Sequence, residues 1–524
     1  MSKPILSVRN LSVSLPKGAD RPYAVHNAGF DLHAGEILCI VGESGSGKSV
    51  LSSALMGAAP EGLAVTGGQV LLGETDLVPL RESQFRAIRG RDIAMIFQEP
   101  MASLNPALTV AAQIEEVFEL HSDFDAAERA RRARALVESM RLPNPDRILK
   151  SYPHQLSGGQ CQRVVIAMAL AMNPSVLIAD EPTTALDVTT QAQVLKLVGE
   201  LRDLHGHGIV FITHDFGVVA DIADRVAVMR HGEIVEIGDA KQVLTAPRHD
   251  YTKALIAAVP SLTPHDRPVP ADAAPVLTVQ HLHHAYGSVS VLKDIELSLP
   301  PGRVVSIVGE SGCGKSTLAK AMIRLIEAKG GRVEVAGTDI LGLSSSDLRS
   351  KRRSIQMIFQ DPFGSLNPRR RIGPMIARGA RLAGASASEA RSRTENLLEM
   401  VGLQKSAYWR KPGAFSGGQR QRVGVARALA MQPDVLIADE SVSALDVSVQ
   451  AQVLDLLRDL QQRLNLAIVF ITHDLRVAAQ ISDEIVVMQK GEIVERGTAA
   501  QVLGAPQHPY TKTLLDAAPG RGTF

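Results

Sequence analysis

Short, wholly apolar runs alternate along this chain with longer segments that mix apolar and charged residues. Val176-Leu-Ile-Ala179 and Ile209-Val-Phe-Ile212 are runs of strand length, whereas Val50–Met56 and Gln162–Met172 are compatible with helices. Short apolar runs bounded by polar residues favour buried strands. Strands that alternate with helices predict an α/β fold, with a largely parallel sheet and helices around it.

The same order of apolar runs and polar motifs occurs twice. The offset between matching motifs falls only from 267 residues (Gly42 to Gly309) to 259 residues (Asp215 to Asp474). Internal repetition with conserved order indicates that one domain is duplicated. Between the copies, residues 261–275 contain four prolines in fifteen positions. We therefore predict a domain at 1–260, an extended linker at 261–275 and a second domain at 276–524. Such a linker reaches up to about 45 Å and lets the two domains pair within the chain.

Two further features of each half can be placed. Leu6–Leu11 and Val276–Leu282 are the predicted opening strands. Residues 98–155 and 360–414 are richer in helical and charged residues, and we interpret them as a helical subdomain inserted between motifs. The arginine-rich run 128–134 within the first of these is interpreted as the solvated face of a helix.

Composition narrows the class of protein. The chain has 524 residues, of which 45% are hydrophobic and 21% charged, and its net charge is +1. Nothing in this balance favours a nucleic-acid partner. Three widely separated cysteines disfavour a disulfide framework or a zinc site. We find neither a signal peptide nor an apolar run near the ~20 residues that span a membrane. We expect a cytoplasmic protein that meets the membrane only through partners.

Two glycine-rich loops carry the strongest chemical signal. Each has the pattern G-x-x-x-x-G-K-[ST] after an apolar run and before a helix-compatible segment. Glycines let successive N–H groups converge on phosphates, the lysine adds positive charge at the β/γ-phosphates, and the hydroxyl can ligate Mg²⁺. The residues are Gly42, Glu43, Ser44, Gly45, Ser46, Gly47, Lys48 and Ser49, and then Gly309, Glu310, Ser311, Gly312, Cys313, Gly314, Lys315, Ser316 and Thr317.

An acidic pair follows an apolar strand in each half. Asp180 and Glu181 lie at the C-terminal edge where α/β proteins bind ligands, and Asp439 and Glu440 repeat them. The aspartate is predicted to hold Mg²⁺ directly or through water. The glutamate is the candidate base, or water-orienting group, for attack on a γ-phosphate.

Two other polar motifs recur beside these. His214 and His473 each follow a β-rich run, and we expect a neutral imidazole that hydrogen-bonds the γ-phosphate. Ser157, Gly158, Gly159 and Gln160, repeated as Ser416, Gly417, Gly418 and Gln419, precede a helix, and helix N-termini bind anions. Each half thus has a second anion-binding helix N-terminus but only one complete set of nucleotide-binding motifs. This suggests that the second anion site binds the nucleotide of the other half.

Taken together, these motifs resemble those of the ATP-binding-cassette ATPases over nearly the whole of both halves. The resemblance implies two P-loop domains in tandem, each a RecA-like core with an inserted helical subdomain and an antiparallel β subdomain. It implies ATP and Mg²⁺ as cofactors. It matches Gln98 and Gln360 to a loop that senses Mg²⁺ and the transmembrane partner. The implied metal-binding residues are Ser49, Gln98, Asp180, Ser316, Gln360 and Asp439.

The family's head-to-tail dimer implies two mixed sites, to which Ala185-Leu-Asp187 and Ala444-Leu-Asp446 would contribute as crossing loops. In one site, Lys48, Asp180, Glu181 and His214 would face Ser416, Gly417 and Gly418. In the other, Lys315, Asp439, Glu440 and His473 would face Ser157, Gly158 and Gly159. Tyr23 and Tyr286 are the candidates for stacking on adenine, although either could be an ordinary strand residue.

The sequence departs from the family pattern at two positions. Ser441 stands where proline usually follows the glutamate, and Cys161 follows the first signature where a longer polar residue is common. Neither removes a ligand or the base, so both sites are expected to hydrolyse ATP, with unequal rates possible.

The nearer resemblance is to the oligopeptide/dipeptide importer ATPases. It rests on Phe97–Pro106 and Phe359–Pro368, and on the endings His249–Pro260 and His508–Pro519. A fused pair of cassettes is similar to the peptide, microcin and glutathione importers, with the microcin C/peptide type first. This implies two integral-membrane permeases, a periplasmic or lipid-anchored substrate-binding protein, and a peripheral location at the cytoplasmic face of the inner membrane. The alternative is a soluble double cassette that acts on ribosomes, whose linker would be long, charged and helical.

Overall fold

The computed structural model describes residues 3–184, 186–264, 273–361, 364–443 and 445–523. The chain divides into two compact units, one built mainly from residues before Pro260 and the other mainly from Pro260 onward. The boundaries at 260 and 275 remain a prediction, and positions 265–272 of the expected linker lie outside the described residues. Each unit is described by itself.

The first unit opens with an antiparallel sheet in the order β2-β1-β4-β5. Leu6, Val8, Leu11 and Val13 are buried along β1 and form one face of the core. The strand continues past its predicted end at Leu11 because the register shifts around Asn10, whose φ is 50°. The bounds are β1 Leu6–Ser14, β2 Tyr23–Leu32, β4 Ala64–Leu72 and β5 Thr75–Asp76.

A six-stranded sheet in the order β10-β9-β3-β8-β7-β6 forms the centre of the first unit. Every residue of β3, β7 and β8 is buried, as expected for parallel strands covered on both faces. Only β10 runs antiparallel to its neighbour. The bounds are β3 Ile37–Val41, β6 Ile93–Ile96, β7 Val176–Asp180, β8 Gly208–Thr213, β9 Arg225–Arg230 and β10 Glu233–Asp239.

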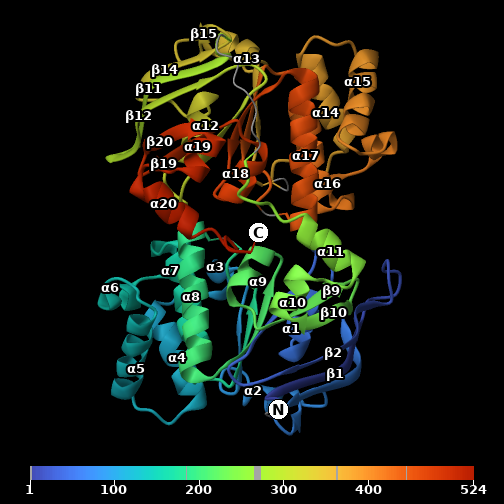
Figure 1. Cartoon of the computed structure of the whole chain (residues 1–524), viewed down its shortest axis with the longest axis vertical. Helices are drawn as coiled ribbons and strands as arrows, with labels where there is room; N and C mark the ends of the chain where they lie inside the picture. The colour runs from blue at the N-terminus through green and yellow to red at the C-terminus, as the bar shows by residue number, and fades with distance from the viewer. Residues whose placement is uncertain (1–2, 185, 265–272, 362–363, 444, 524) are drawn as a thin grey trace. The chain divides into compact units, whose positions relative to one another are not determined.

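The helices between residues 100 and 155 form the predicted helical segment, which lies on the side of the unit away from β1 and β2 (Figure 1). The arginine-rich run lies on α5, where Arg131 and Arg132 pair with Glu128 at the surface. The helices are α1 Lys48–Leu55, α2 Glu82–Arg86, α3 Pro100–Ser103, α4 Val110–His121, α5 Ala126–Ser139, α6 Pro145–Lys150, the 3-10 helix η1 Pro153–Gln155, α7 Gly158–Leu170, α8 Val188–His205, α9 Phe216–Ile222, α10 Ala240–Thr245 and α11 Asp250–Ala257.

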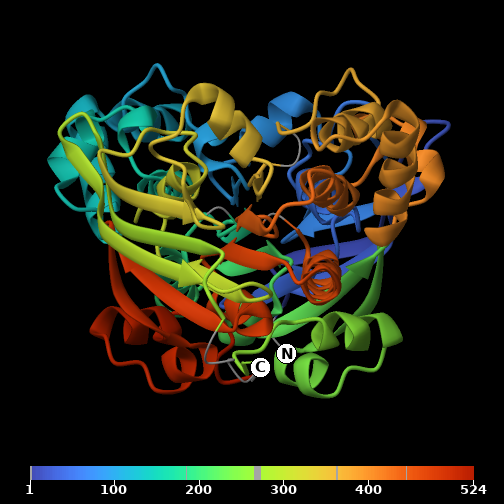
Figure 2. The ribbon, with the colours of Figure 1, turned by 90° about the horizontal axis from the view of Figure 1, so that it is seen from above.

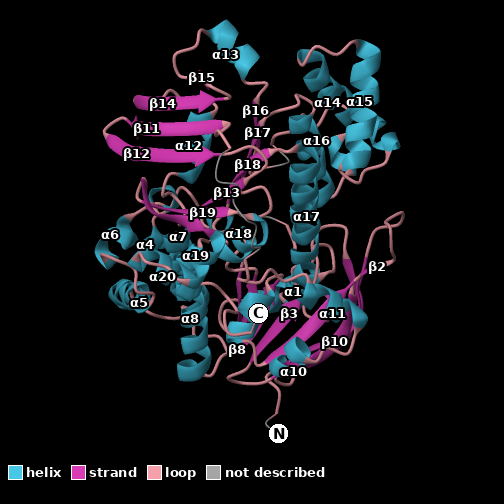
Figure 3. Ribbon diagram, turned by 45° about the horizontal axis from the view of Figure 1, so that its top comes forward, coloured by secondary structure: helices cyan, strands magenta, loops and turns pink. Residues whose placement is uncertain are grey.

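The second unit repeats both sheets. Its antiparallel sheet has the order β12-β11-β14-β15 and its mixed sheet the order β16-β17-β18-β13-β19-β20. Figure 3 shows β11, β12 and β14 side by side, with α14 and α15 on the opposite side of the unit. The strands are β11 Leu277–Tyr286, β12 Val289–Leu299, β13 Val304–Val308, β14 Gly330–Val335, β15 Thr338–Asp339, β16 Ile355–Ile358, β17 Val435–Asp439, β18 Ala467–Ile471, β19 Glu484–Gln489 and β20 Glu492–Thr498.

In each unit two helices follow the last strand and lie at one edge of their own unit (Figure 2). No helix among the described residues has the length and apolar character needed to cross a bilayer. The helices of the second unit are α12 Lys315–Met322, α13 Ser345–Lys351, α14 Ile372–Leu382, α15 Ala387–Met400, the 3-10 helices η2 Lys405–Trp409 and η3 Pro412–Ala414, α16 Gly417–Leu429, α17 Val447–Leu464, α18 Leu475–Ile481, α19 Ala499–Gly504 and α20 Pro509–Asp516.

Candidate nucleotide sites

The two glycine-rich loops connect a buried strand to a helix, β3 to α1 and β13 to α12. Gly47 has φ 109°, and a Cβ there would lie 2.4 Å from the carbonyl oxygen of Ala24, so the position requires glycine. Lys48 Nζ donates to the carbonyl oxygens of Gly42 (2.7 Å) and Glu43 (3.0 Å). In the second unit Lys315 Nζ makes the same two bonds at 2.8 Å. Each loop therefore encircles its own lysine ammonium.

The predicted metal-binding aspartates lie against the first turn of the helix after each loop. Ser49 Oγ donates to Asp180 Oδ1 at 3.3 Å, and Ser52 Oγ donates to Asp180 Oδ2 at 3.1 Å. Burial raises the pKa of Asp180, and these two hydroxyl bonds oppose the increase. Ser316 Oγ donates to Asp439 Oδ1 at 3.1 Å. A hydroxyl and a carboxylate thus meet in both units.

Three side chains surround the carboxylate of Glu181. Gln98 Nε2 and Thr184 Oγ1 donate to Oε2 at 3.0 and 2.9 Å, and His214 Nδ1 lies 3.3 Å from the same oxygen. Burial alone would raise the pKa of Glu181, but the contacts with His214 and Thr184 and the charge of Lys48 together lower it to about 2. The carboxylate is therefore ionised at neutral pH and able to accept a proton.

Glu440 has a related but looser environment. Gln360 Nε2 donates to Glu440 Oε2 at 2.6 Å, whereas His473 Nδ1 and Lys315 Nζ each lie 3.9 Å from Oε1. Ser443, which stands where the first unit has Thr184, donates instead to the main-chain oxygen of Glu440 at 2.9 Å. Burial would raise the pKa of Glu440, but His473 and Lys315 lower it.

The surroundings of His214 shift its pKa upward, toward the charged imidazolium and away from the neutral form that the sequence predicts. Burial would lower the pKa of His214, but the hydrogen bond and charge of Glu181, with the charge of Asp215, raise it. Nδ1 faces Glu181, so Nε2 is the ring nitrogen left to contact a phosphate.

The main chain at both glutamates is strained. Glu181 has φ 47° and Glu440 has φ 44°, in the left-handed region that side chains other than glycine rarely adopt. Their N–H groups donate to the carbonyl oxygens of Ile212 (3.0 Å) and Ile471 (2.9 Å) on the neighbouring strand, which holds the turn. Strain of this kind collects at functional sites.

The signature motifs begin helices α7 and α16. Ser157 Oγ accepts from the N–H of Gln160 at 3.3 Å, and Gln160 Oε1 accepts from the N–H of Ser157 at 3.0 Å. Ser416 and Gln419 form the same reciprocal cap at 3.4 and 3.2 Å. Because of this cap α7 begins at Gly158, before the predicted start at Gln162. Of the expected crossing loops, Ala185 and Ala444 lie outside the described residues.

The two candidate adenine-stacking residues occupy different surroundings. Tyr23 begins β2 and stacks on His26 with ring centroids 4.8 Å apart. Tyr286 ends β11, is 52% exposed and meets His284 edge-on at 4.7 Å. Their role stays a prediction.

The two departures from the family pattern are both buried. The hydroxyl of Ser441 has no hydrogen-bond partner among the described residues. Cys161 Sγ lies 3.3 Å from Met101 Sδ.

Sequence reasoning missed several polar residues at these sites. Ser52 lies one helical turn after Ser49, so helical spacing could have identified it. Thr184 follows Glu181 by three residues, but nothing in the sequence distinguishes it from an ordinary turn residue. Tyr251 and Tyr510 lie in the repeated endings His249–Pro260 and His508–Pro519, and that repetition could have identified them.

Comparison with known proteins identifies the family. The family described as "ABC transporter" matches residues 25–184 and 292–443, and "Oligopeptide/dipeptide transporter, C-terminal region" matches residues 235–284 and 494–522. The chain belongs to the ABC transporter ATP-binding proteins, within the oligopeptide/dipeptide transporter group. It binds ATP and hydrolyses it for transport, as the motifs predicted.

Individual relatives match the fused arrangement end to end. The chain is 46% identical to "Peptidoglycan transport ATP-binding protein YejF" of Agrobacterium fabrum, over 99% of this chain and 97% of that protein. It is also 46% identical to "Glutathione import ATP-binding protein GsiA" of Escherichia coli O157:H7, over 98% of this chain and 89% of that protein. Among solved structures, a dimeric post-hydrolysis state of the ATP-binding cassette MJ0796 bound to ADP and Pi is 30% identical, with 45% of this chain and 98% of that chain covered and a TM-score of 0.41.

Proposed function

We propose that this chain is the ATPase of an importer for peptides or peptide-like compounds. The observation that carries the proposal is that the oligopeptide/dipeptide C-terminal region occurs twice, beginning in the last part of each ATPase unit. The names of the relatives, one for glutathione import and one for peptidoglycan transport, support the same class of cargo. The chain would act with two integral-membrane permeases and a periplasmic or lipid-anchored binding protein, at the cytoplasmic face of the inner membrane.

In this proposal each glycine-rich loop binds the phosphates of one ATP. The Ser49 hydroxyl and the Asp180 carboxylate would hold Mg²⁺, with Gln98 nearby, and Ser316, Asp439 and Gln360 would do so in the second unit. One hydroxyl and one carboxylate suit a cation that takes its other ligands from phosphates and water. When bound, Mg²⁺ would neutralise charge on the phosphates.

Glu181 and Glu440 would then accept the proton of the attacking water. Lys48 and Lys315 would donate to phosphate oxygens from the same ammonium groups that bond the carbonyl oxygens of their loops. Because Nδ1 of His214 is directed at Glu181, Nε2 would donate to the γ-phosphate while the pair keeps the carboxylate in position. His473 would do the same at the second site.

We also propose that the signature of each half completes the site of the other, as family membership suggests. Four double variants test this pairing. Lys48→Ala with Ser416→Arg, or Lys315→Ala with Ser157→Arg, should damage one site and leave the ATPase activity of the other. Lys48→Ala with Ser157→Arg, or Lys315→Ala with Ser416→Arg, should damage both sites. Equal losses in all four would refute the pairing.

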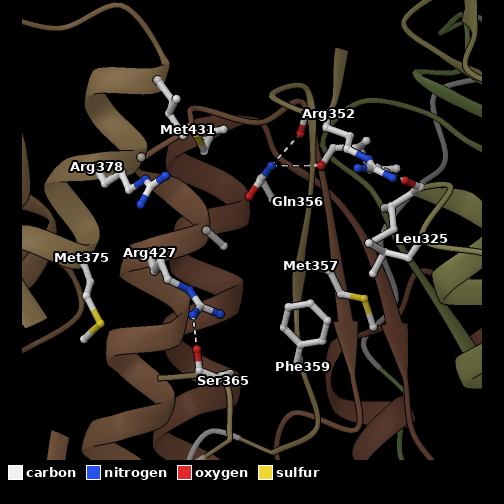
Figure 4. Close-up of a pocket in the computed structure, with 15 residues that line it drawn as sticks. Leu325, Arg352, Gln356, Met357, Phe359, Ser365, Met375, Arg378, Arg427 and Met431 are labelled. Carbon is white, nitrogen blue, oxygen red and sulfur yellow. Dashed lines mark hydrogen bonds between the residues drawn. The ribbon is translucent and has the colours of Figure 1, made fainter. Parts of the chain in front are cut away.

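A cavity of about 380 Å³ in the second unit suits a permease segment (Figure 4). It lies between the loop that starts at Phe359, directly before Gln360, and helix α14, which contributes Met375 and Leu382. Phe359 and Leu382 are 38% and 55% exposed, so apolar surface is available. Arg427, whose pKa is lowered by burial, lines the cavity and donates to the main-chain oxygen of Ser365.

Co-purification tests the proposed partners and the alternative together. A tagged chain expressed with the two permeases of its operon should retain both, and Phe359→Asp should weaken the complex. Deletion of the gene should abolish uptake of labelled peptides. ATPase activity stimulated by ribosomes, with no permease bound, would instead support the soluble double cassette.

A further inference from the structure

A tyrosine from the C-terminal helix of each unit contacts the glycine-rich loop of that same unit. Tyr251 on α11 accepts a hydrogen bond from the N–H of Glu43 at 3.2 Å and donates one to Glu43 Oε2 at 3.2 Å. Tyr510 on α20 accepts from the N–H of Glu310 at 3.0 Å. The partners are 208 and 200 residues apart in sequence, and the contact recurs in both units.

The N-terminal residues of α11 and α20 fix the positions of the two tyrosines. His249 Nδ1 accepts from the N–H of Tyr251 at 3.1 Å, and Glu236 on β10 accepts from the N–H groups of Arg248 (2.8 Å) and His249 (3.1 Å). In the second unit His508 caps Tyr510 at 3.2 Å, and Glu495 on β20 accepts from Gln507 and His508 at 2.7 and 3.0 Å. Hydrogen bonds thus connect the C-terminal segment of each unit both to the edge strand, β10 or β20, and to the glycine-rich loop.

The contacted residue also holds the loop's lysine. The N–H of Glu43 donates to Tyr251, while its carbonyl oxygen accepts from Lys48 Nζ at 3.0 Å. Glu310 joins Tyr510 to Lys315 Nζ in the same way, at 3.0 and 2.8 Å. Burial raises the pKa of Tyr251 to about 12 and also raises that of Tyr510, so both phenols keep their proton at neutral pH. One hydroxyl therefore holds the residue whose carbonyl oxygen binds the lysine.

We propose that Tyr251 and Tyr510 are positioning residues that couple the C-terminal segment of each unit to its phosphate loop. This inference rests on the proposed role of the loops in binding ATP. Each hydroxyl holds the loop in the conformation that receives phosphate, so bound nucleotide and the docked helix stabilise one another. Because such coupling is reciprocal, a partner that undocks α11 or α20 lowers the affinity for ATP, and bound ATP lowers the affinity for that partner by the same factor.

The test removes only the two hydroxyls. In the full chain, Tyr251→Phe with Tyr510→Phe should weaken binding of mant-AMPPNP about fivefold, the effect of one net hydrogen bond. The KM for ATP should rise similarly, while kcat at saturating ATP changes less than twofold. AMPPNP should slow amide hydrogen exchange in α11 and α20 of the wild type and not of the variant.

Controls separate this inference from its premises. Lys253→Ala alters an exposed side chain on the same helix, and Tyr408→Phe removes a tyrosine hydroxyl from the helical segment of the second unit. Both should bind like the wild type. Unchanged affinity and unchanged exchange in the double Phe variant would overturn the coupling. Normal nucleotide binding by Lys48→Ala with Lys315→Ala would overturn the loop assignment, and the inference with it.

Discussion

Gln98 Nε2 donates a hydrogen bond to Glu181 Oε2 at 3.0 Å, and Gln360 repeats the contact with Glu440 at 2.6 Å. The loop after β6 thereby holds the acid after β7. Since the amide nitrogen faces the glutamate, the amide oxygen is the atom left for a cation. The residue directly before Gln360 lines the proposed permease cavity, so movement at that cavity would reach the glutamate through a single side chain.

Removing the proposed bases should stop turnover. Glu181→Gln with Glu440→Gln keeps the size and polarity of both side chains but removes their ability to accept a proton. We expect ATP hydrolysis to fall by ~10²–10⁴ while ATP remains bound. Phosphate release and filter-retained radioactive ATP measure the two effects. Hydrolysis at the wild-type rate would show that neither glutamate is the base.

The two sites should differ in rate because Thr184 bonds the carboxylate of Glu181, whereas Ser443 bonds only the main chain of Glu440. In a Glu440→Gln background, Thr184→Val should raise the remaining turnover by roughly two- to fivefold, since a carboxylate with fewer donors is the stronger base. Ser443→Ala in a Glu181→Gln background is the matched control and should change turnover less than twofold. Slower turnover in the Thr184 variant would contradict this account.

The pKa values of Glu181 and His214 are shifted in opposite directions, so the two side chains should contribute to stability over different pH ranges. The pKa of Glu181 falls from 4.5 to about 2, so its contribution to stability is complete above pH 4.5 and is lost as pH falls toward 2. The pKa of His214 is raised above 6.5, so its contribution is complete below 6.5 and is lost as pH rises through the folded-state value. Glu181→Gln should lower the pKa of His214, measured by NMR titration of the imidazole. An unchanged pKa of His214 in this variant would show that Glu181 does not cause the upward shift.

Replacing Ser441 should stabilise the second unit. Its buried hydroxyl has no hydrogen-bond partner among the described residues, and Pro182 holds the same position after a glutamate of similar φ. Ser441→Pro removes the unsatisfied group and restricts the unfolded chain, which is worth about 1 kcal/mol. The melting temperature of the second unit should rise by about 2–4 °C. Pro182→Ser should shift the first unit in the opposite direction, and a lower melting temperature for Ser441→Pro would exclude the explanation.

Thiol labelling should report on the second loop. Cys313 is only 6% exposed, and burial raises the pKa of its thiol above the ordinary 9.0. Alkylation should therefore be slow at neutral pH and accelerate as pH rises. Modified protein should lose nucleotide binding at one site, with ATP protecting. Cys313→Ser should bind normally and resist the reagent, because Ser46 fills this place in the first loop. Modification without loss of binding would contradict the loop assignment.

The sequence predicted those parts of the site that are contiguous in the chain. The loops, the acidic pairs and the signatures are short strings, and duplication made them unmistakable. The start of α7 is also readable, because Ser157 and Gln160 have the spacing of a capping box, although the predicted helix begins only at Gln162.

Contacts between distant residues could not be read in this way. The bond between Tyr251 and Glu43 depends on how Glu236 on β10 binds the N–H groups of Arg248 and His249 before α11, and no local pattern encodes those contacts. The bulge at Asn10 extends β1 beyond its apparent end because its partner strands, rather than its own residues, continue the ladder.

The left-handed main chain at Glu181 and Glu440 has a consequence for how such chains change over time. Glycine or asparagine at either position would relieve the backbone and raise stability, yet it would remove the carboxylate. Selection for a sturdier protein and selection for an active one therefore pull these two codons in opposite directions. In a descendant whose ATPase site is inactive, that glutamate should be among the first residues to be replaced. Glycine or asparagine at this position would therefore mark a site that no longer hydrolyses ATP.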